Sequence, residues 1–308
     1  MTQIMCVGHA VEDYVFRMGA IPTEARKHQA DEFTTVGGGP AANAAVAIAR
    51  LGGDVRLAAR LGDDAVAASI EADLEREGVD CAGLRRFAGC RSSLSAVMVD
   101  DDGQRMIVNY LDASLPQSGD WVADVAPETV AAVLVDVRWP DGGAAGLKLA
   151  RARGVPGVLD ADHPIPAGGA LFADASHIAF SADGLRRYLQ TEDLGAGVQR
   201  VARETGAWCC VTDGENGVAI SARGDDLDHA PSLPVRAVDT LGAGDVWHGA
   251  FALRLAEGAS ELEAVRFASA AAAIKVTRPG GRAGAPQRSE VDEALAANTT
   301  SIRRESVQ

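Results

Sequence analysis

Positive charge is scarce in this chain of 308 residues, in which 29 Lys and Arg stand against 43 Asp and Glu and the net charge is −14 at pH 7. No basic block interrupts the acidic composition, so the surface repels nucleic acid and anionic membranes, and we expect neither as a partner. An anionic substrate would require positive charge that is gathered locally at its site. Single Lys and Arg residues are therefore more informative here than they are in a basic protein.

Cysteine is also sparse, with five residues, an odd number, and no CxxC pair. This argues against a disulfide framework and a structural zinc site, and it favours a reducing compartment. The opening MTQIMCVGHAVEDYVF lacks the basic region and long apolar run of a signal peptide. No uncharged apolar stretch reaches roughly 18 residues, the length of a membrane span. We expect a soluble, cytoplasmic protein.

Most of the chain alternates between short apolar runs and longer segments with helical periodicity. Strands are predicted at residues 4–8, 55–59, 131–137, 155–160, 177–180 and 208–212. Helices are predicted at residues 41–50, 64–77, 142–153, 194–205, 244–257 and 261–277. This alternation predicts an α/β fold in which helices cover both faces of a parallel sheet.

Two segments depart from this alternation and predict a second, smaller sheet. Residues 14–36 are polar and irregular, and residues 93–110 contain two strand-like runs on either side of Asp101-Asp102-Gly103. Exposed strands suit both segments better than core elements do. The predicted organisation is a main domain of residues 1–13, 37–92 and 111–298, a small sheet of residues 14–36 and 93–110, and a polar tail at 299–308.

The run DTLGAGD at residues 239–245 lies between a strand-like stretch at 235–238 and a predicted helix. Its glycines remove side chains where a helix N-terminus exposes unpaired N–H groups, so the turn can hold a phosphate. Asp245 follows directly, and a carboxylate there is suited to take a proton from an attacking hydroxyl. The alternative is an ordinary N-cap aspartate. A GxxxxGK[ST] run is missing from the sequence, which excludes a Walker-type phosphate loop.

The longer run DTLGAGDVWHGAF at 239–251 resembles the C-terminal signature of the PfkB family of carbohydrate kinases. The run GGGPAANAAVAIARLG at 37–52 resembles the N-terminal glycine-rich signature of the same family. The two runs occur in the family's order, and the resemblance covers nearly the whole chain. It implies a ribokinase-like three-layer α/β/α sandwich with a small β-sheet lid, and an ATP-dependent transfer of phosphate to a sugar hydroxyl.

The resemblance also implies a role for each matching position. Asp245 takes the place of the base that deprotonates the sugar hydroxyl. The N–H groups that stabilise the transferred phosphoryl group are implied to be those of Gly242, Ala243, Gly244 and Asp245 itself. Sugar contacts are implied for Asp13, Gly38, Gly39 and Asn43. One more residue separates the proline from the asparagine here than in many members of the family.

ATP and Mg²⁺ are the implied cofactors. The run VTDGENG at 211–217 resembles the strand and turn that line the nucleotide pocket, and TRPGGRAG at 277–284 resembles a segment that wraps the adenine. Nucleotide contacts are thereby implied for Thr212, Gly214, Gly217 and Gly281. The alternatives are an ordinary hairpin turn and a glycine-rich turn that caps a helix. Many members carry an Asn-x-x-Glu element near the magnesium-bound phosphates; the FSAD run at 180–183 lacks the asparagine and leaves Asp183 as an indirect candidate.

Several runs outside the two signatures resemble the 6-deoxy-6-sulfofructose kinases within the family, among them SSLSAVMVD at 92–100 and VDVRW at 135–139. This resemblance implies that Lys27, Asn109 and Arg138 cradle a sulfonate. Arg138 follows an apolar strand and would lie at its carboxyl end, where α/β sheets bind ligands. Guanidinium groups bind oxyanions in bidentate fashion. The alternatives are a solvated side chain for Lys27, the exposed face of a strand for Asn109, and a structural ion pair for Arg138.

Sulfofructose, phosphorylated to its 1-phosphate, is therefore the first candidate substrate. Fructose, tagatose 6-phosphate and other sugars are alternatives, and a non-catalytic sugar- or nucleotide-binding regulator with the same fold is an alternative of another class. Exposed strand edges seek partners. The small sheet therefore predicts a homodimer in which two such sheets pair edge to edge.

Overall fold

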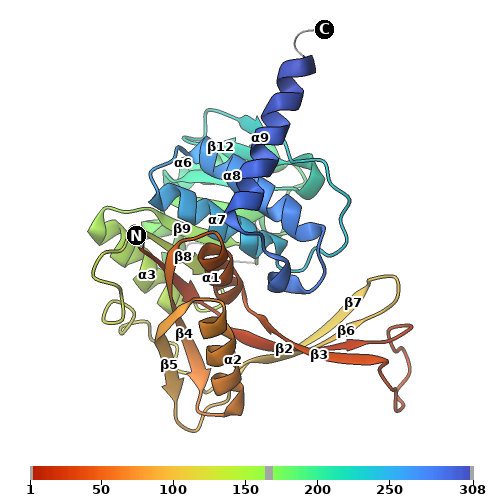
Figure 1. The fold of residues 1–308 in the computed structure, drawn as a ribbon. Coiled ribbons are helices and arrows are strands. Elements are labelled where there is room, and N and C mark those ends of the chain that lie inside the picture. Colours follow the sequence, from red (N-terminus) through yellow and green to blue (C-terminus); the bar gives the residue numbers. More distant parts are fainter. Residues whose placement is uncertain (1–2, 164–168, 306–308) are drawn as a thin grey trace.

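The computed structural model describes residues 3–163 and 169–305, and within them two β-sheets organise the chain (Figure 1). The large sheet has nine strands in the order β13-β12-β11-β10-β9-β8-β1-β4-β5. All neighbouring strands from β10–β11 to β4–β5 pair in parallel, whereas β12 and β13 are added antiparallel at one edge. The carboxyl ends of the parallel strands therefore meet at one side of the sheet, where α/β folds bind ligands.

The bounds of the elements follow the predicted alternation closely. The strands of the large sheet are β1 (Gln3–Gly8), β4 (Asp54–Gly62), β5 (Asp80–Phe87), β8 (Ala132–Asp136), β9 (Gly157–Ala161), β10 (His177–Ser181), β11 (Trp208–Thr212), β12 (Val218–Ser221) and β13 (Asp228–Ala230). The helices are α1 (Pro40–Arg50), α2 (Ala65–Arg76), α3 (Pro140–Arg153), α4 (Ala170–Asp174), α5 (Ala182–Leu189), α6 (Leu194–Thr205), α7 (Ala243–Ala256), α8 (Glu261–Val276) and α9 (Arg288–Glu305). Two short 3₁₀ turns, η1 (Gly214–Asn216) and η2 (Gly281–Gly284), complete the described elements.

The large sheet separates two hydrophobic cores, because side chains alternate along each strand. On β1, Ile4 and Cys6 join the core that contains helices α1, α7 and α8, whereas Met5 and Val7 join the core that contains α3 and α6. Helices thus cover both faces, in the three layers of an α/β/α sandwich (Figure 1). The predicted fold class is confirmed.

The small sheet projects from this body and has the order β3-β2-β6-β7 (Figure 1). Its strands are β2 (Val11–Arg17), β3 (Glu32–Gly38), β6 (Leu94–Val99) and β7 (Arg105–Tyr110). Within it β2 pairs with β6 in parallel, and the outer pairs are antiparallel. Asp13, Ser95 and Asn109 stand opposite one another across three neighbouring strands, so their side chains share one face of this sheet.

Three sequence-based expectations differ from the structure. The predicted strand at 235–238 is wrong: the backbone passes the end of α8, where Val238 and Asp239 donate their N–H groups to the carbonyl of Val276, and the Val238 side chain is 64% exposed. Several elements were not predicted: strands β5, β12 and β13 and helices α4, α5 and α9. Strand β5 lies at the edge of the large sheet, where strands often carry charged residues. Residues 299–305, expected as part of a polar tail, continue helix α9.

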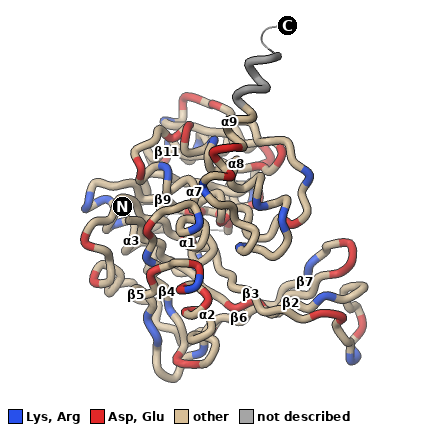
Figure 2. Tube along the Cα trace, viewed as in Figure 1, with Lys and Arg blue, Asp and Glu red and all other residues tan. Residues whose placement is uncertain are grey.

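Charge is distributed without segregation between the two sheets. Figure 2 shows acidic and basic residues interspersed along the described trace of both. Among the helices of that part of the chain, none combines the length and apolarity needed to cross a bilayer.

Candidate active site

Asp245 lies in the first turn of α7, at the carboxyl edge of the large sheet. The helix begins after Gly242, whose φ of 75° is a left-handed conformation that glycine adopts without strain. A Cβ on Gly244 would have open space around it, so the backbone is accessible there. The first N–H groups of a helix lack partners within the helix. Ala243 donates its N–H to Thr240 at 3.2 Å, which makes the N–H groups of Gly244 and Asp245 the better placed for an anion.

The Asp245 side chain is partly buried, and its Oδ2 accepts a hydrogen bond of 2.7 Å from Nδ2 of Asn43 on α1. The structure thus joins the two sequence signatures. The pKa of Asp245 is raised to about 7, first by burial and then by the nearby carboxylates of Asp162 and Asp136, although the Asn43 hydrogen bond and the charge of Arg138 lower it. A carboxylate with such a pKa can exchange a proton near neutral pH.

Asp136, at the end of β8, forms hydrogen bonds with several of the segments that surround Asp245. It accepts hydrogen bonds from the N–H groups of His9 (2.7 Å), Ala41 (3.0 Å) and Arg138 (2.9 Å), which belong to three different segments. Burial raises its pKa to about 6 despite these three bonds. The sequence reasoning missed Asp136, although a carboxylate that directly follows a buried strand was the available signal.

Arg138 lies beside Asp136 at the carboxyl end of β8, as predicted. Its Nη2 is 3.9 Å from Oδ2 of Asp162, and its buried Nε–H has no hydrogen-bond partner among the described residues. Burial, together with the charges of Arg138 and Arg60, lowers the pKa of His9 to about 4. Two guanidinium groups and a neutral histidine therefore line this part of the site, in a protein with a net charge of −14.

The glycines of the first signature allow close approach between β3, α1 and β2. A Cβ on Gly38 would lie 2.3 Å from Oδ2 of Asp13, so only glycine leaves room for that carboxylate. Gly39 has a φ of 95°, and a Cβ there would meet the carbonyl of His9 at 2.4 Å. Burial raises the pKa of Asp13, while a hydrogen bond with Ser95 and the charge of Arg282 lower it. Asp13 therefore lies between the small sheet and the main body.

Asn109 and Lys27 both belong to the small-sheet segments, but only Asn109 shares a face with a predicted sugar contact. Asn109 shares a face of the small sheet with Asp13, two strands away. Lys27 belongs to the loop that joins β2 to β3 at the far end of the small sheet (Figure 1). The structure does not bring Lys27 next to Arg138, which follows β8 in the main body.

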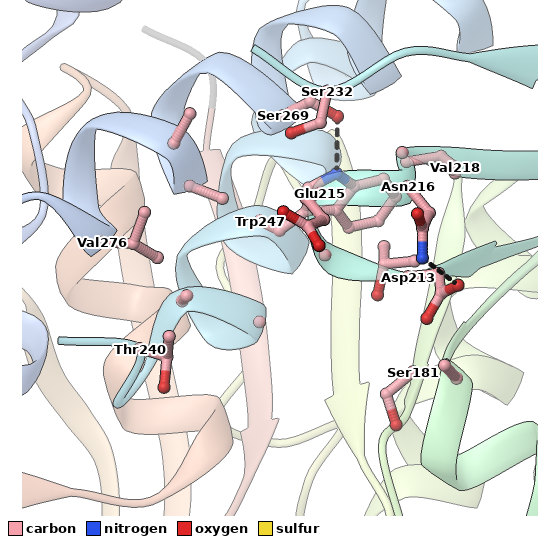
Figure 3. Close-up of a pocket in the computed structure, with 18 of the residues that line it drawn as sticks. Ser181, Asp213, Glu215, Asn216, Val218, Ser232, Thr240, Trp247, Ser269 and Val276 are labelled. Atoms are coloured by element: carbon pink, nitrogen blue, oxygen red, sulfur yellow. Dashed lines mark hydrogen bonds between the residues drawn. The ribbon is translucent and has the colours of Figure 1, made fainter. Parts of the chain in front are cut away.

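A cavity of about 1050 Å³ opens beside the first turn of α7 (Figure 3). Thr212, Gly214 and Gly217, for which nucleotide contacts were predicted, line it. Trp247 on α7 and Val276 on α8 also line it and were not predicted; Nε1 of Trp247 donates to Oγ of Ser269 at 3.2 Å (Figure 3). Because Thr240 and Gly244 line it as well, the cavity reaches the turn that precedes Asp245.

Asp183 lines this cavity, whereas Gly281, for which a nucleotide contact was predicted, is not among the residues that line it. Asp183 lies in the first turn of α5, with a largely exposed carboxylate 3.6 Å from Arg186. Gly281 lies on η2 and donates its N–H to Oδ2 of Asp239 at 3.1 Å. The described residues contain no group of three side chains that could hold a metal ion by themselves.

Comparison with known proteins agrees with this architecture. Residues 1–288 match the family model of pfkB family carbohydrate kinases. The ribokinase of Bacillus subtilis is 29% identical over 304 residues, which cover 96% of this chain and 100% of that protein. A putative ribokinase from Agrobacterium tumefaciens has 36% identity and a TM-score of 0.88, covering 97% of this chain and 98% of its own. The Arabidopsis thaliana ribokinase, solved with ribose and ATP, has 26% identity and a TM-score of 0.82, covering 95% and 98% of the two chains.

A three-layer α/β/α body, a separate small sheet and a glycine turn with an aspartate at a helix N-terminus define a phosphotransferase with an alcohol group as acceptor. The chain belongs to the PfkB family of carbohydrate kinases. This sets aside the alternative of a non-catalytic regulator.

Proposed function

We propose that this kinase transfers the γ-phosphoryl group of ATP directly to a sugar hydroxyl, with Asp245 as the base. Asp245 removes the hydroxyl proton while the N–H groups of the turn 242–245 stabilise charge on the phosphoryl oxygens. The hydrogen bond from Asn43 fixes the orientation of the carboxylate. Sugar hydroxyls are held by Asp13, Gly38, Gly39 and Asn43.

ATP is proposed to occupy the cavity beside α7. Its adenine lies against the apolar wall that includes Trp247 and Val276, and its phosphates reach the turn through Thr240 and Gly244. Mg²⁺ would arrive with the phosphates, since it is commonly bound by one or two carboxylates plus phosphate oxygens. Asp183 is the carboxylate proposed to contact it, directly or through water. The ion would neutralise charge on the phosphates.

The sugar is proposed to be 6-deoxy-6-sulfofructose, which is phosphorylated to its 1-phosphate. The observation that carries this proposal is Arg138, a partly buried guanidinium with an unpaired N–H beside the reacting carboxylate. Buried hydrogen-bond donors are almost always paired, so a ligand oxyanion is the expected partner. Segments 14–36 and 93–110 are proposed to act as the lid, which brings Asn109 toward the sulfonate. Lys27 can contact the sulfonate only if its loop moves or if it comes from a second chain.

Ribose is the second candidate, because the curated relative from Bacillus subtilis and both solved structures are described as ribokinases. An ADP-release assay over sulfofructose, fructose, fructose 6-phosphate, tagatose 6-phosphate and ribose tests the proposal. We expect the highest kcat/KM for sulfofructose. A higher value for ribose or another uncharged sugar would contradict the assignment of the substrate and leave the kinase chemistry standing.

A homodimer through the small sheet is also proposed. The face opposite Asp13 and Asn109 is rich in apolar residues, including Phe33 (56% exposed) and Val108 (57% exposed). Exposed apolar surface of this kind marks an interaction site. Light scattering should give the mass of two chains for the protein and of one chain for Val108→Glu. Ile107→Glu, on the same strand but the opposite face, is the matched control and should remain dimeric. A single-chain mass for the unmodified protein would disprove the dimer.

A further inference from the structure

Asp239 is the first residue of the run 239–245, called the glycine turn below, and its carboxylate accepts several hydrogen bonds. Oδ1 accepts the N–H of Leu241 at 2.9 Å, and Oδ2 accepts those of Gly280 at 3.0 Å and Gly281 at 3.1 Å. One carboxylate therefore fixes the start of the turn that leads to Asp245 and joins it to the loop after α8. Although burial raises the pKa of Asp239, these N–H groups and two nearby cations lower it to about 2.

The two cations differ in the part of the molecule that carries them. Lys275 is fully buried on α8; its Nζ donates to the Asp239 carbonyl at 2.7 Å and lies 3.4 Å from Oδ2. Arg105 is the first residue of β7 in the small sheet, and its Nη2 donates to Oδ1 of Asp239 at 2.5 Å. Asp239 thus retains a buried counter-ion of its own domain whether or not Arg105 is present. The contact with Arg105 is therefore separable from the fold of the turn.

Arg105 also lies on the face of the small sheet that carries substrate contacts. Along β7, residues 105, 107 and 109 point to one side, and Asn109 stands in register with Ser95 and Asp13. The face that meets the sugar and the contact with the glycine turn therefore belong to one rigid element. Any displacement of the small sheet moves the sugar contacts and Arg105 together.

We propose that Arg105 is a positioning residue, which holds the glycine turn in register with the sugar-bearing sheet by its ion pair with Asp239. The proposal rests on the proposed roles of Asp245 and the turn 242–245. Phosphoryl transfer needs the acceptor hydroxyl, the base and the N–H groups aligned at once, and a misplacement of about 1 Å costs on the order of 100-fold in rate. Arg105 acts through Asp239 and touches none of the reacting atoms.

The test compares Arg105→Gln and Arg105→Lys with Arg56→Gln. Arg56 on β4 is the matched control: it pairs with Asp80 at 2.6 Å, its side chain is 22% exposed against 26% for Arg105, and it lies at the amino end of its strand, away from the site. For Arg105→Gln we expect kcat to fall about 10- to 100-fold. KM for ATP should rise by less than this, because only Thr240, Ala243 and Gly244 of the loosened turn line the ATP cavity. Arg105→Lys should recover part of the loss. Arg56→Gln should keep the kcat of the unmodified protein.

A second comparison separates positioning from general destabilisation. If Arg105 acts through Asp239, adding Arg105→Gln to Asp239→Asn should lower kcat by less than about twofold further, because coupled residues are not additive. Amide hydrogen exchange of residues 239–245 should be faster in Arg105→Gln than in Arg56→Gln. The proposal would be overturned if Arg105→Gln and Arg56→Gln lost kcat equally. It would also be overturned if Arg105→Gln left both kcat and the hydrogen exchange of residues 239–245 unchanged.

The kinetic test can use whichever sugar is turned over, so failure of sulfofructose as substrate does not affect it. Full activity of Asp245→Asn would contradict the role of the base. The exchange of residues 239–245 would still report whether Arg105 holds the turn. The two failures are therefore distinguishable.

Discussion

Replacing Asp245 by asparagine is expected to lower kcat by about 10²- to 10⁴-fold, the contribution typical of a positioned general base. Asparagine keeps the size of the side chain and an oxygen that can accept the 2.7 Å hydrogen bond from Asn43, so the geometry of the turn is preserved. What is lost is the ability to take a proton. KM for ATP is expected to change little, because Asp245 is not among the residues that line the cavity. Steady-state ADP release with the preferred sugar measures both constants.

Stability measurements separate loss of the base from loss of the fold. The folded-state pKa of Asp245 is raised from 3.8 to about 7, so its ionisation costs stability progressively as pH rises between these two values, and the cost is fully present above pH 7. The amide side chain of the variant carries no charge at any pH, so Asp245→Asn should melt at the same or a higher temperature at pH 8. Near-normal kcat in a well-folded variant would contradict the role of Asp245.

The pH dependence of the unmodified protein gives an independent check. The base must be ionised before it can accept a proton, so kcat/KM should fall as pH drops below about 7. Asn43 lowers the pKa of Asp245 by its hydrogen bond, so Asn43→Ala should shift this acid limb to higher pH. The residual rate of Asp245→Asn should lack the acid limb. An acid limb that persists in that variant would assign it to another group.

The fold was largely predictable because its signals are local. Alternating apolar runs and capped helices predicted most strands and helices of the large sheet within a few residues. The stretch 235–238 misled because it is strand-like in sequence, yet the N–H group of Val238 bonds to the end of α8 instead of a neighbouring strand. Whether an apolar run joins a sheet depends on a partner that is distant in the sequence.

The candidate site was predictable only where a motif marked it. Asp245 and Asn43 were predicted from the two glycine-rich signatures, and the structure shows that they form a hydrogen bond although they lie 202 positions apart in the sequence. Asp136 and the pair of Arg105 with Asp239 were missed, because each acts through contacts with segments far along the chain. A lone arginine at a strand end carries no signal of its partner. The contact of Lys27 with the sugar stays a prediction. Within one chain Lys27 lies away from Arg138, so the contact requires that its loop moves or that Lys27 comes from a second chain.

Replacing Arg138 by glutamine is expected to raise KM for an anionic sugar such as sulfofructose by about 10- to 150-fold, since a hydrogen bond to a charged group contributes about 1.5–3 kcal/mol. KM for fructose should change little, because that sugar offers no anion to the guanidinium. ADP release with the two sugars measures the difference. Arg151→Gln, which removes an exposed arginine paired with Asp174 on the surface, is the control and should affect neither sugar. Equal losses for both sugars would assign Arg138 to structure instead of specificity.

Asp162 supplies the reciprocal test. Its carboxylate lies 3.9 Å from Arg138, where it competes with a bound oxyanion for the guanidinium and repels it. Asp162→Asn should therefore lower KM for sulfofructose and leave KM for fructose unchanged, the opposite sign to Arg138→Gln. In the background of Arg138→Gln the same change should have a much smaller effect, because the competed cation is gone. Opposite shifts at two adjacent residues, confined to the anionic sugar, cannot arise from a general loss of stability; they require a sugar anion that binds at Arg138.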